Sequence, residues 1–132
     1  MDKDFAEPID KNDDLGVFEA FAAHILKHSL NKEGREIIKI FMYARFKEDR
    51  FHRVHFQWKE MLMMSRLTDY VSKRIQEGGF RKMDPRITVF CYQAMVWNMA
   101  MYKNMMKKIE FVTLEALCRE CTKIFVEGIR LR

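Results

Sequence analysis

Apolar residues recur every three or four positions along most of this chain, which is the spacing that places them on one face of a helix. The pattern predicts five helices, over about residues 15–30, 33–48, 51–77, 85–106 and 111–128. The third is either one long helix or two helices joined near residues 48–51, where no Gly or Pro marks a break. The expected fold is therefore all-α, with five to six helices in a single domain over residues 15–132.

Turn and capping residues mark the ends of several of these helices. Asp13 or Asp14 can cap the first helix, because a short side-chain oxygen accepts the unpaired N–H groups of a first turn. Gly78-Gly79 ends the third, since glycine enters a left-handed C-cap without steric cost. The pair Asp84-Pro85 opens the fourth, with Asp as N-cap and Pro at the first helical position.

The last two predicted helices carry more apolar surface than a chain of 132 residues readily buries. The run from Ile87 to Tyr102 contains no charged residue, and the segment from Phe111 to Leu131 is amphipathic. The apolar face of that segment is predicted to contain Leu114, Leu117, Cys118, Cys121, Ile124 and Phe125. We therefore expect a second protein chain to cover these helices.

The uncharged run does not predict a membrane helix. It is 16 residues long and includes Thr88, Gln93 and Asn98, whereas a membrane span needs roughly 20 apolar residues. The three cysteines are an odd number and do not suggest a disulfide framework, so a reducing cytoplasm is the expected location.

Composition and charge further restrict the class of protein. Apolar residues make up 48% of the chain and charged residues 33%, which excludes a disordered protein. The net charge of +5 fits a solvated surface with a basic tilt and does not by itself indicate an anionic partner. Residues 1–14 are acidic instead, and we expect them to form a flexible leader.

Two groups of residues could support metal or redox chemistry. Cys118 and Cys121 form one C-x-x-C, but a structural zinc site needs four ligands and no second motif supplies them. His24 and His28 are four positions apart without the Glu of a metalloprotease motif. Packing cysteines and a polar helix edge are the favoured interpretations, and no metal or cofactor is expected. No nucleophile motif or phosphate-binding loop appears, so we do not expect an enzyme.

Methionine and aromatic residues are frequent in the predicted second and third helices. Methionine is flexible and fills irregular or adaptable cavities. Met42, Met61, Met63 and Met64, with Phe41, Phe56 and Trp58, could therefore line a pocket for an apolar or aromatic molecule, or could form an ordinary core.

The order of the helices, the turn over residues 78–85 (GGFRKMDP) and the closing segment 125–129 (FVEGI) resemble the C-terminal domain of TetR-family transcription regulators. The resemblance covers about residues 15–131. It implies that the last two helices pair with those of a second subunit in a four-helix bundle, while the preceding helices enclose an effector pocket. The implied pocket contains Phe41, Met42, Trp58, Met61, Met64, Phe90 and Trp97. The implied dimer interface contains Met95, Met99, Met105, Leu114, Leu117, Cys118, Cys121, Ile124 and Phe125.

One feature of the family is missing from this sequence. The helix-turn-helix head of about fifty residues has no counterpart before Leu15, and the acidic leader would repel phosphate. The resemblance therefore implies a ligand-sensing and dimerisation domain of a repressor that a small hydrophobic effector releases from DNA. Its expected partners are a second copy and that effector, with DNA bound only through the absent head. The alternative is a stand-alone helical module that binds another protein.

Overall fold

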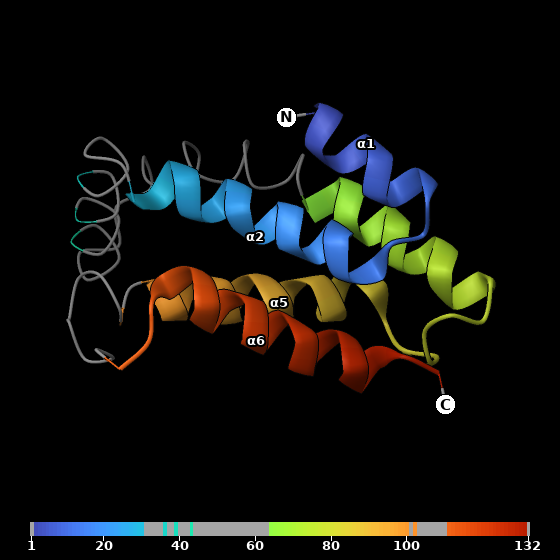
Figure 1. Cartoon of the computed structure of the whole chain (residues 1–132). Helices are drawn as coiled ribbons and strands as arrows, with labels where there is room; N and C mark the ends of the chain where they lie inside the picture. The colour runs from blue at the N-terminus through green and yellow to red at the C-terminus, as the bar shows by residue number, and fades with distance from the viewer. Residues whose placement is uncertain are drawn as a thin grey trace.

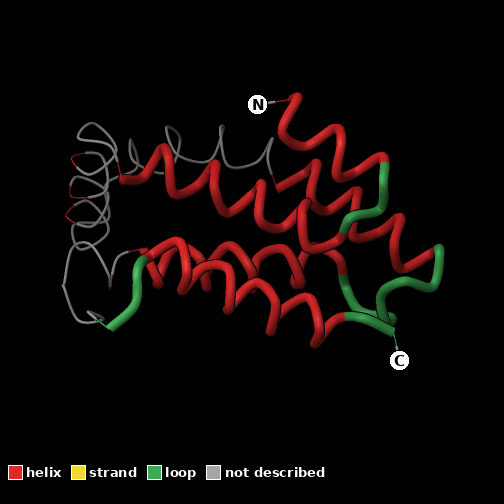
Figure 2. Tube along the Cα trace, in the orientation of Figure 1, coloured by secondary structure: helices red, strands yellow, loops and turns green. Residues whose placement is uncertain are grey.

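A computed structural model describes residues 2–30, 36, 39, 43, 64–100, 102 and 111–131. The helices in these ranges are α1 (Asp2–Asp10), α2 (Asp14–Leu30), a helix over residues 64–76, α5 (Pro85–Ala100) and α6 (Leu114–Ile129). Within the described part, no strand appears (Figure 2), and the β-structure is an isolated bridge between Phe80 and Arg130. The prediction of an all-α fold is thus confirmed.

Three helices form the centre of the molecule. α2 packs on both α5 and α6, and these two pack on each other. α5 starts at the end of the molecule that holds the C-terminus, and α6 returns to that end, so the two are antiparallel (Figure 1). α1 lies against α2 on the side away from α6. Between them, α5 and α6 have one side turned toward α2 and another turned outward.

An aromatic cluster joins these helices at Phe18 of α2. Its ring centroid lies 4.8 Å from Tyr92 of α5, 5.5 Å from Phe125 of α6 and 6.3 Å from Phe80. The Tyr92 hydroxyl donates to the Phe18 carbonyl at 2.8 Å and pairs with the Thr122 hydroxyl at 2.8 Å. The buried polar atoms at this centre therefore have partners, which removes the cost of desolvating them.

Capping side chains begin the helices where the sequence predicts. Asp13 caps α2, since its carboxylate accepts the Gly16 N–H at 3.0 Å. Asp84 caps α5 by accepting the Arg86 N–H at 2.9 Å, and its contacts with Arg86 lower the pKa of the Asp84 carboxyl. Thr113 caps α6 by accepting the Ala116 N–H at 3.2 Å. Of the two predicted caps for α2, Asp13 is the correct one.

The helix over residues 64–76 ends in a Schellman turn at Gly78. This glycine has a positive φ of 82°, and its N–H bonds to the Ile75 carbonyl at 3.1 Å. The Gly79 N–H bonds to the Arg74 carbonyl at 2.9 Å. Beyond the turn, the Arg81 N–H donates to the Ile129 carbonyl at 2.9 Å. The turn thereby ties the end of α6 to the helix over residues 64–76.

We expect Gly78→Ala to lower the free energy of unfolding by about 1–2 kcal/mol, because a Cβ is strained at positive φ. Gly128→Ala is the matched control: it lies in α6, where an added methyl group would meet open space, and is expected to stabilise by about 0.5–1 kcal/mol. Chemical denaturation followed by circular dichroism measures both. Equal effects of the two substitutions would contradict the strained turn.

The acidic segment before α2 differs from the expectation. Residues 2–10 form α1 rather than a flexible leader, and Phe5 is buried against Phe21 with their ring centroids 6.5 Å apart. The prediction missed this helix because charged residues dominate the segment, while its docking depends mainly on Phe5 and on Ile9, which is partly buried against the core.

Most of one other predicted helix, and about half of another, lie outside the described residues. Glu36, Lys39 and Tyr43 of the predicted 33–48 segment are helical, and the described part of the 51–77 segment begins at Met64. The predicted continuation of α5 to residue 106 also lies outside, apart from Tyr102.

Candidate functional site

The outward face of α5 is largely apolar and, beyond the exposed Arg86 in its first turn, carries no charge. Ile87 and Phe90 are each 63% exposed, and Cys91 is exposed beside them. Together with Ala94 and Asn98 they follow steps of three and four, and we call these five residues the outer α5 stripe. Its opposite face is buried and contains Thr88, Val89, Tyr92, Val96 and Ala100. A helix that is apolar on both faces indicates that something else covers the outer one.

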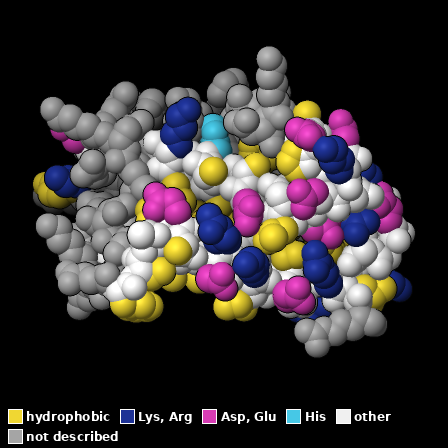
Figure 3. All heavy atoms as spheres, viewed as in Figure 1, with side chains coloured by type: hydrophobic (Ala, Val, Ile, Leu, Met, Phe, Trp, Pro, Cys, Tyr) yellow, Lys and Arg dark blue, Asp and Glu magenta, His cyan; other side chains and the backbone are white. Residues whose placement is uncertain are grey.

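A second apolar stripe lies on α6, beside α5. Ile124 is 72% exposed, and Leu117 and Cys121 are half-buried on the same face, at steps of three and four. We call these three residues the outer α6 stripe. Figure 3 shows hydrophobic side chains along the lower edge of the molecule, where α5 and α6 run, and charged side chains across the face toward the viewer. The exposed large apolar side chains of α5 and α6, Ile87, Phe90 and Ile124, all lie in these two stripes.

The structure places the predicted interface residues in three different environments. Ile124 is exposed, and Leu117 and Cys121 are half-buried. Met95, Met99 and Phe125 pack partly against the core of their own chain. Leu114 and Cys118 are buried within the single chain, so their assignment to an interface is corrected. Met105 lies outside the described residues.

The correction on α6 has a specific cause. The buried line of this helix is Leu114, Cys118, Thr122, Val126 and Ile129. Its central residue is Thr122, a polar side chain that the predicted apolar face does not include. Thr122 is fully buried because its hydroxyl pairs with that of Tyr92. The buried face of α6 is thus rotated about the helix axis relative to the predicted face.

The predicted effector pocket is only partly within the described residues. Met64 and Trp97 are partly buried and pack against the core. Phe90 is exposed in the outer α5 stripe, so its assignment to a pocket is corrected. Phe41, Met42, Trp58 and Met61 lie outside the described residues.

The C-x-x-C thiols lie in an environment that suppresses their reactivity. Burial raises the pKa of the Cys118 thiol and also the pKa of the half-buried Cys121 thiol. A thiolate is the reactive and metal-binding form, and burial without a cation disfavours it. Among the described residues, no three His, Cys, Asp or Glu side chains gather as a metal site would require.

We expect Cys118 to react slowly with iodoacetamide in the folded chain. Because its pKa is raised, its rate should keep increasing with pH beyond the range in which an ordinary thiol levels off. Mass spectrometry of labelled peptides measures the rate, with denatured protein as the reference. Rapid labelling of Cys118 at neutral pH would contradict its burial and reopen the redox interpretation.

A buried charged cluster, which the sequence pattern does not reveal, joins α2 to the helix over residues 64–76. The Asp14 carboxylate accepts hydrogen bonds from the Tyr70 hydroxyl at 2.5 Å and from Arg74 Nε at 2.9 Å. Burial and the Asp14 carboxylate raise the pKa of the Tyr70 hydroxyl, which remains protonated and donates. The sequence offered one hint of this cluster, because only one aspartate of the Asp13-Asp14 pair is needed to cap α2.

Comparison with known proteins gives no match to a family model, a curated protein or a solved structure, so a functional assignment depends on the features described above. In the part of the chain that the structure describes, no helix has the length and apolarity that crossing a membrane requires.

Proposed function

We propose that this chain is a ligand-sensing and dimerisation domain of a TetR-like transcription regulator. The observation that carries the proposal is the pair of outer stripes, which place exposed apolar side chains on the outward side of two antiparallel helices, α5 and α6. Two copies related by a twofold axis would bring four such helices together as a bundle. The turn and capping residues that carry the resemblance lie at the start of α5 and the end of α6.

A second copy is a suitable occupant of this face for a physical reason. In a twofold interface each residue occurs once in each chain. Ile87, Phe90 and Ile124 would therefore each be buried in two copies. Burying such side chains stabilises by up to roughly 1.5–3 kcal/mol each when burial is complete. A continuous exposed apolar face of this kind otherwise favours non-specific association.

In the proposed function, an apolar or aromatic effector binds the helices that precede α5. An effector that prefers the conformation unable to bind DNA lowers the affinity for DNA by the ratio of its affinities for the two conformations. DNA is contacted through a separate helix-turn-helix domain. The ligand-sensing domain acts by setting the distance between the two helix-turn-helix domains of the dimer.

The mass of the purified chain at micromolar concentration tests the proposal directly. Light scattering coupled to size-exclusion chromatography is expected to give twice the 16.0 kDa of one chain. A mass equal to that of one chain would count against the proposed function as a dimerising regulator domain. If the chain then formed a stable complex with a different protein, the alternative of a stand-alone interaction module would replace it, with the outer α5 stripe as the surface that binds a partner helix.

A further inference from the structure

The first helix cannot hold its conformation without docking. α1 has nine residues and contains Pro8, which has no N–H to donate within the helix. Isolated helices shorter than about 12–15 residues are marginal in water. Its tertiary contacts include the buried Phe5, packed on Phe21, and the Arg66 guanidinium, 5.7 Å from the centroid of the Phe5 ring. α2, α5 and α6 pack on one another independently of α1.

The elbow between α1 and α2 is tight and specific. Asn12 adopts a left-handed conformation with a φ of 52°, and its N–H bonds to the Ile9 carbonyl at 3.2 Å. The Asp13 N–H bonds to the Pro8 carbonyl at 2.9 Å, which completes a Schellman turn. Asp13 then caps α2 directly. These hydrogen bonds leave the elbow little conformational freedom, so the position of the elbow determines that of α1.

The side chains that hold this elbow come from one face of a single helix. Tyr70, Lys73, Arg74 and Glu77 occupy steps of three and four at the end of the helix over residues 64–76. Lys73 donates to the Asn12 side-chain oxygen at 3.2 Å, and the Asn12 amide donates to Glu77 at 3.1 Å. All four of these side chains thus contact residues 12–14 or one another.

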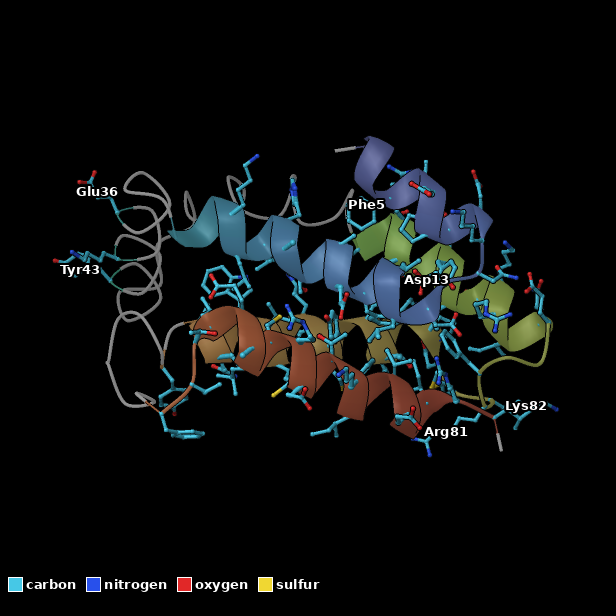
Figure 4. The ribbon with its side chains drawn as sticks, viewed as in Figure 1. Phe5, Asp13, Glu36, Tyr43, Arg81 and Lys82 are labelled. Atoms are coloured by element: carbon cyan, nitrogen blue, oxygen red, sulfur yellow. The ribbon has the colours of Figure 1, made fainter. Side chains whose placement is uncertain are left out.

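Arg74 is the centre of this set. Its Nε and Nη2 atoms bond to the two Asp14 oxygens at 2.9 and 3.3 Å, while Nη1 bonds to Glu77 at 2.9 Å. Its side chain is 17% exposed and that of Asp14 is 7% exposed. Removing one member of so buried a pair leaves the other charge without compensation, which is far more disruptive than breaking a surface pair. Figure 4 labels Phe5 on α1 and Asp13 at the start of α2.

We propose that α1 is a hinged strap that the end of the helix over residues 64–76 holds closed, so that releasing Arg74 from Asp14 frees the elbow, undocks α1 and exposes Phe21. The surface exposed in this way lies next to the central aromatic cluster, because the centroid of the Phe21 ring is 6.1 Å from that of the Tyr92 ring. Displacement of one helix is thereby converted into movement of the segment that precedes α2. This device does not depend on the proposed regulatory function.

The test is amide hydrogen exchange of the full chain, measured by mass spectrometry on Arg74→Gln. Exchange in residues 2–12 is expected to be at least about tenfold faster than in the unsubstituted chain, while α5 and α6 exchange as before. The matched control is Lys11→Gln, which breaks the 2.7 Å pair with Glu7 on the exposed surface of α1. That change is expected to alter exchange by less than about twofold, since exposed pairs contribute little.

Gly79→Ala provides a second route that removes no charge. A Cβ at residue 79 would collide with the Arg74 guanidinium and push it from its place beside Asp14. It is therefore expected to open α1 selectively as well, even if Arg74→Gln does not fold. Equal acceleration in α1, α5 and α6, or no acceleration in α1 with either variant, would overturn the proposal, because the contact would then be structural only or would not hold the strap.

Discussion

Replacing Phe18 with alanine is expected to lower the free energy of unfolding by roughly 3–5 kcal/mol, the typical loss for a buried Phe. Phe18 is fully buried, and its ring touches α5, α6 and the turn residue Phe80 at once. The cavity left by the ring would sit between three helices that the Tyr92 hydrogen bonds hold in place, so it cannot collapse easily. Urea denaturation followed by circular dichroism measures the loss.

Phe111→Ala is the control for this prediction. The residue type and the substitution are the same, but the Phe111 side chain is 90% exposed at the start of the α6 segment. Its replacement is expected to change the free energy of unfolding by less than about 0.5 kcal/mol. Similar losses for the two variants would mean that Phe18 is not the centre of the core.

Replacing Phe90 with glutamate is expected to weaken self-association at least about 100-fold. The substitution removes a large apolar side chain from the outer α5 stripe and introduces a charge, and twofold symmetry makes the change twice per interface. Because Phe90 is 63% exposed in the single chain, the fold of each chain should be retained. Analytical ultracentrifugation over a range of concentrations gives the dissociation constant, and circular dichroism checks the helix content.

Two further measurements make this prediction specific. Lys27→Glu places a glutamate at an exposed position of α2, with twice the change in charge, and is expected to leave the dissociation constant unchanged. Cys91, next to Phe90, is expected to be protected from alkylation in the dimer and to become reactive in Phe90→Glu. A dimer of undiminished strength in Phe90→Glu would place the interface elsewhere.

Several helix ends could be predicted because they depend on local chemistry. Asp84-Pro85 and Gly78 act on backbone groups within a few residues of themselves, so their roles can be predicted from the sequence alone. The same holds for Asp13 as a cap. The adjacent Asp14 shows the limit, since its partners Tyr70 and Arg74 are 56 and 60 positions away. A spacing rule contains no information about contacts at that distance.

The amino-acid sequence by itself determined an all-α fold, the caps that begin α2 and α5, the turn at Gly78 and the excess of apolar surface on α5 and α6. Periodicity and capping suffice for these, because each acts within a few turns of one helix. The tertiary structure decided which side of each helix faces inward. Thr122 is buried because Tyr92 lies opposite it, and Phe5 docks an acidic helix because Phe21 receives it. Polar residues become buried, and charged segments become ordered, only when a distant partner satisfies them.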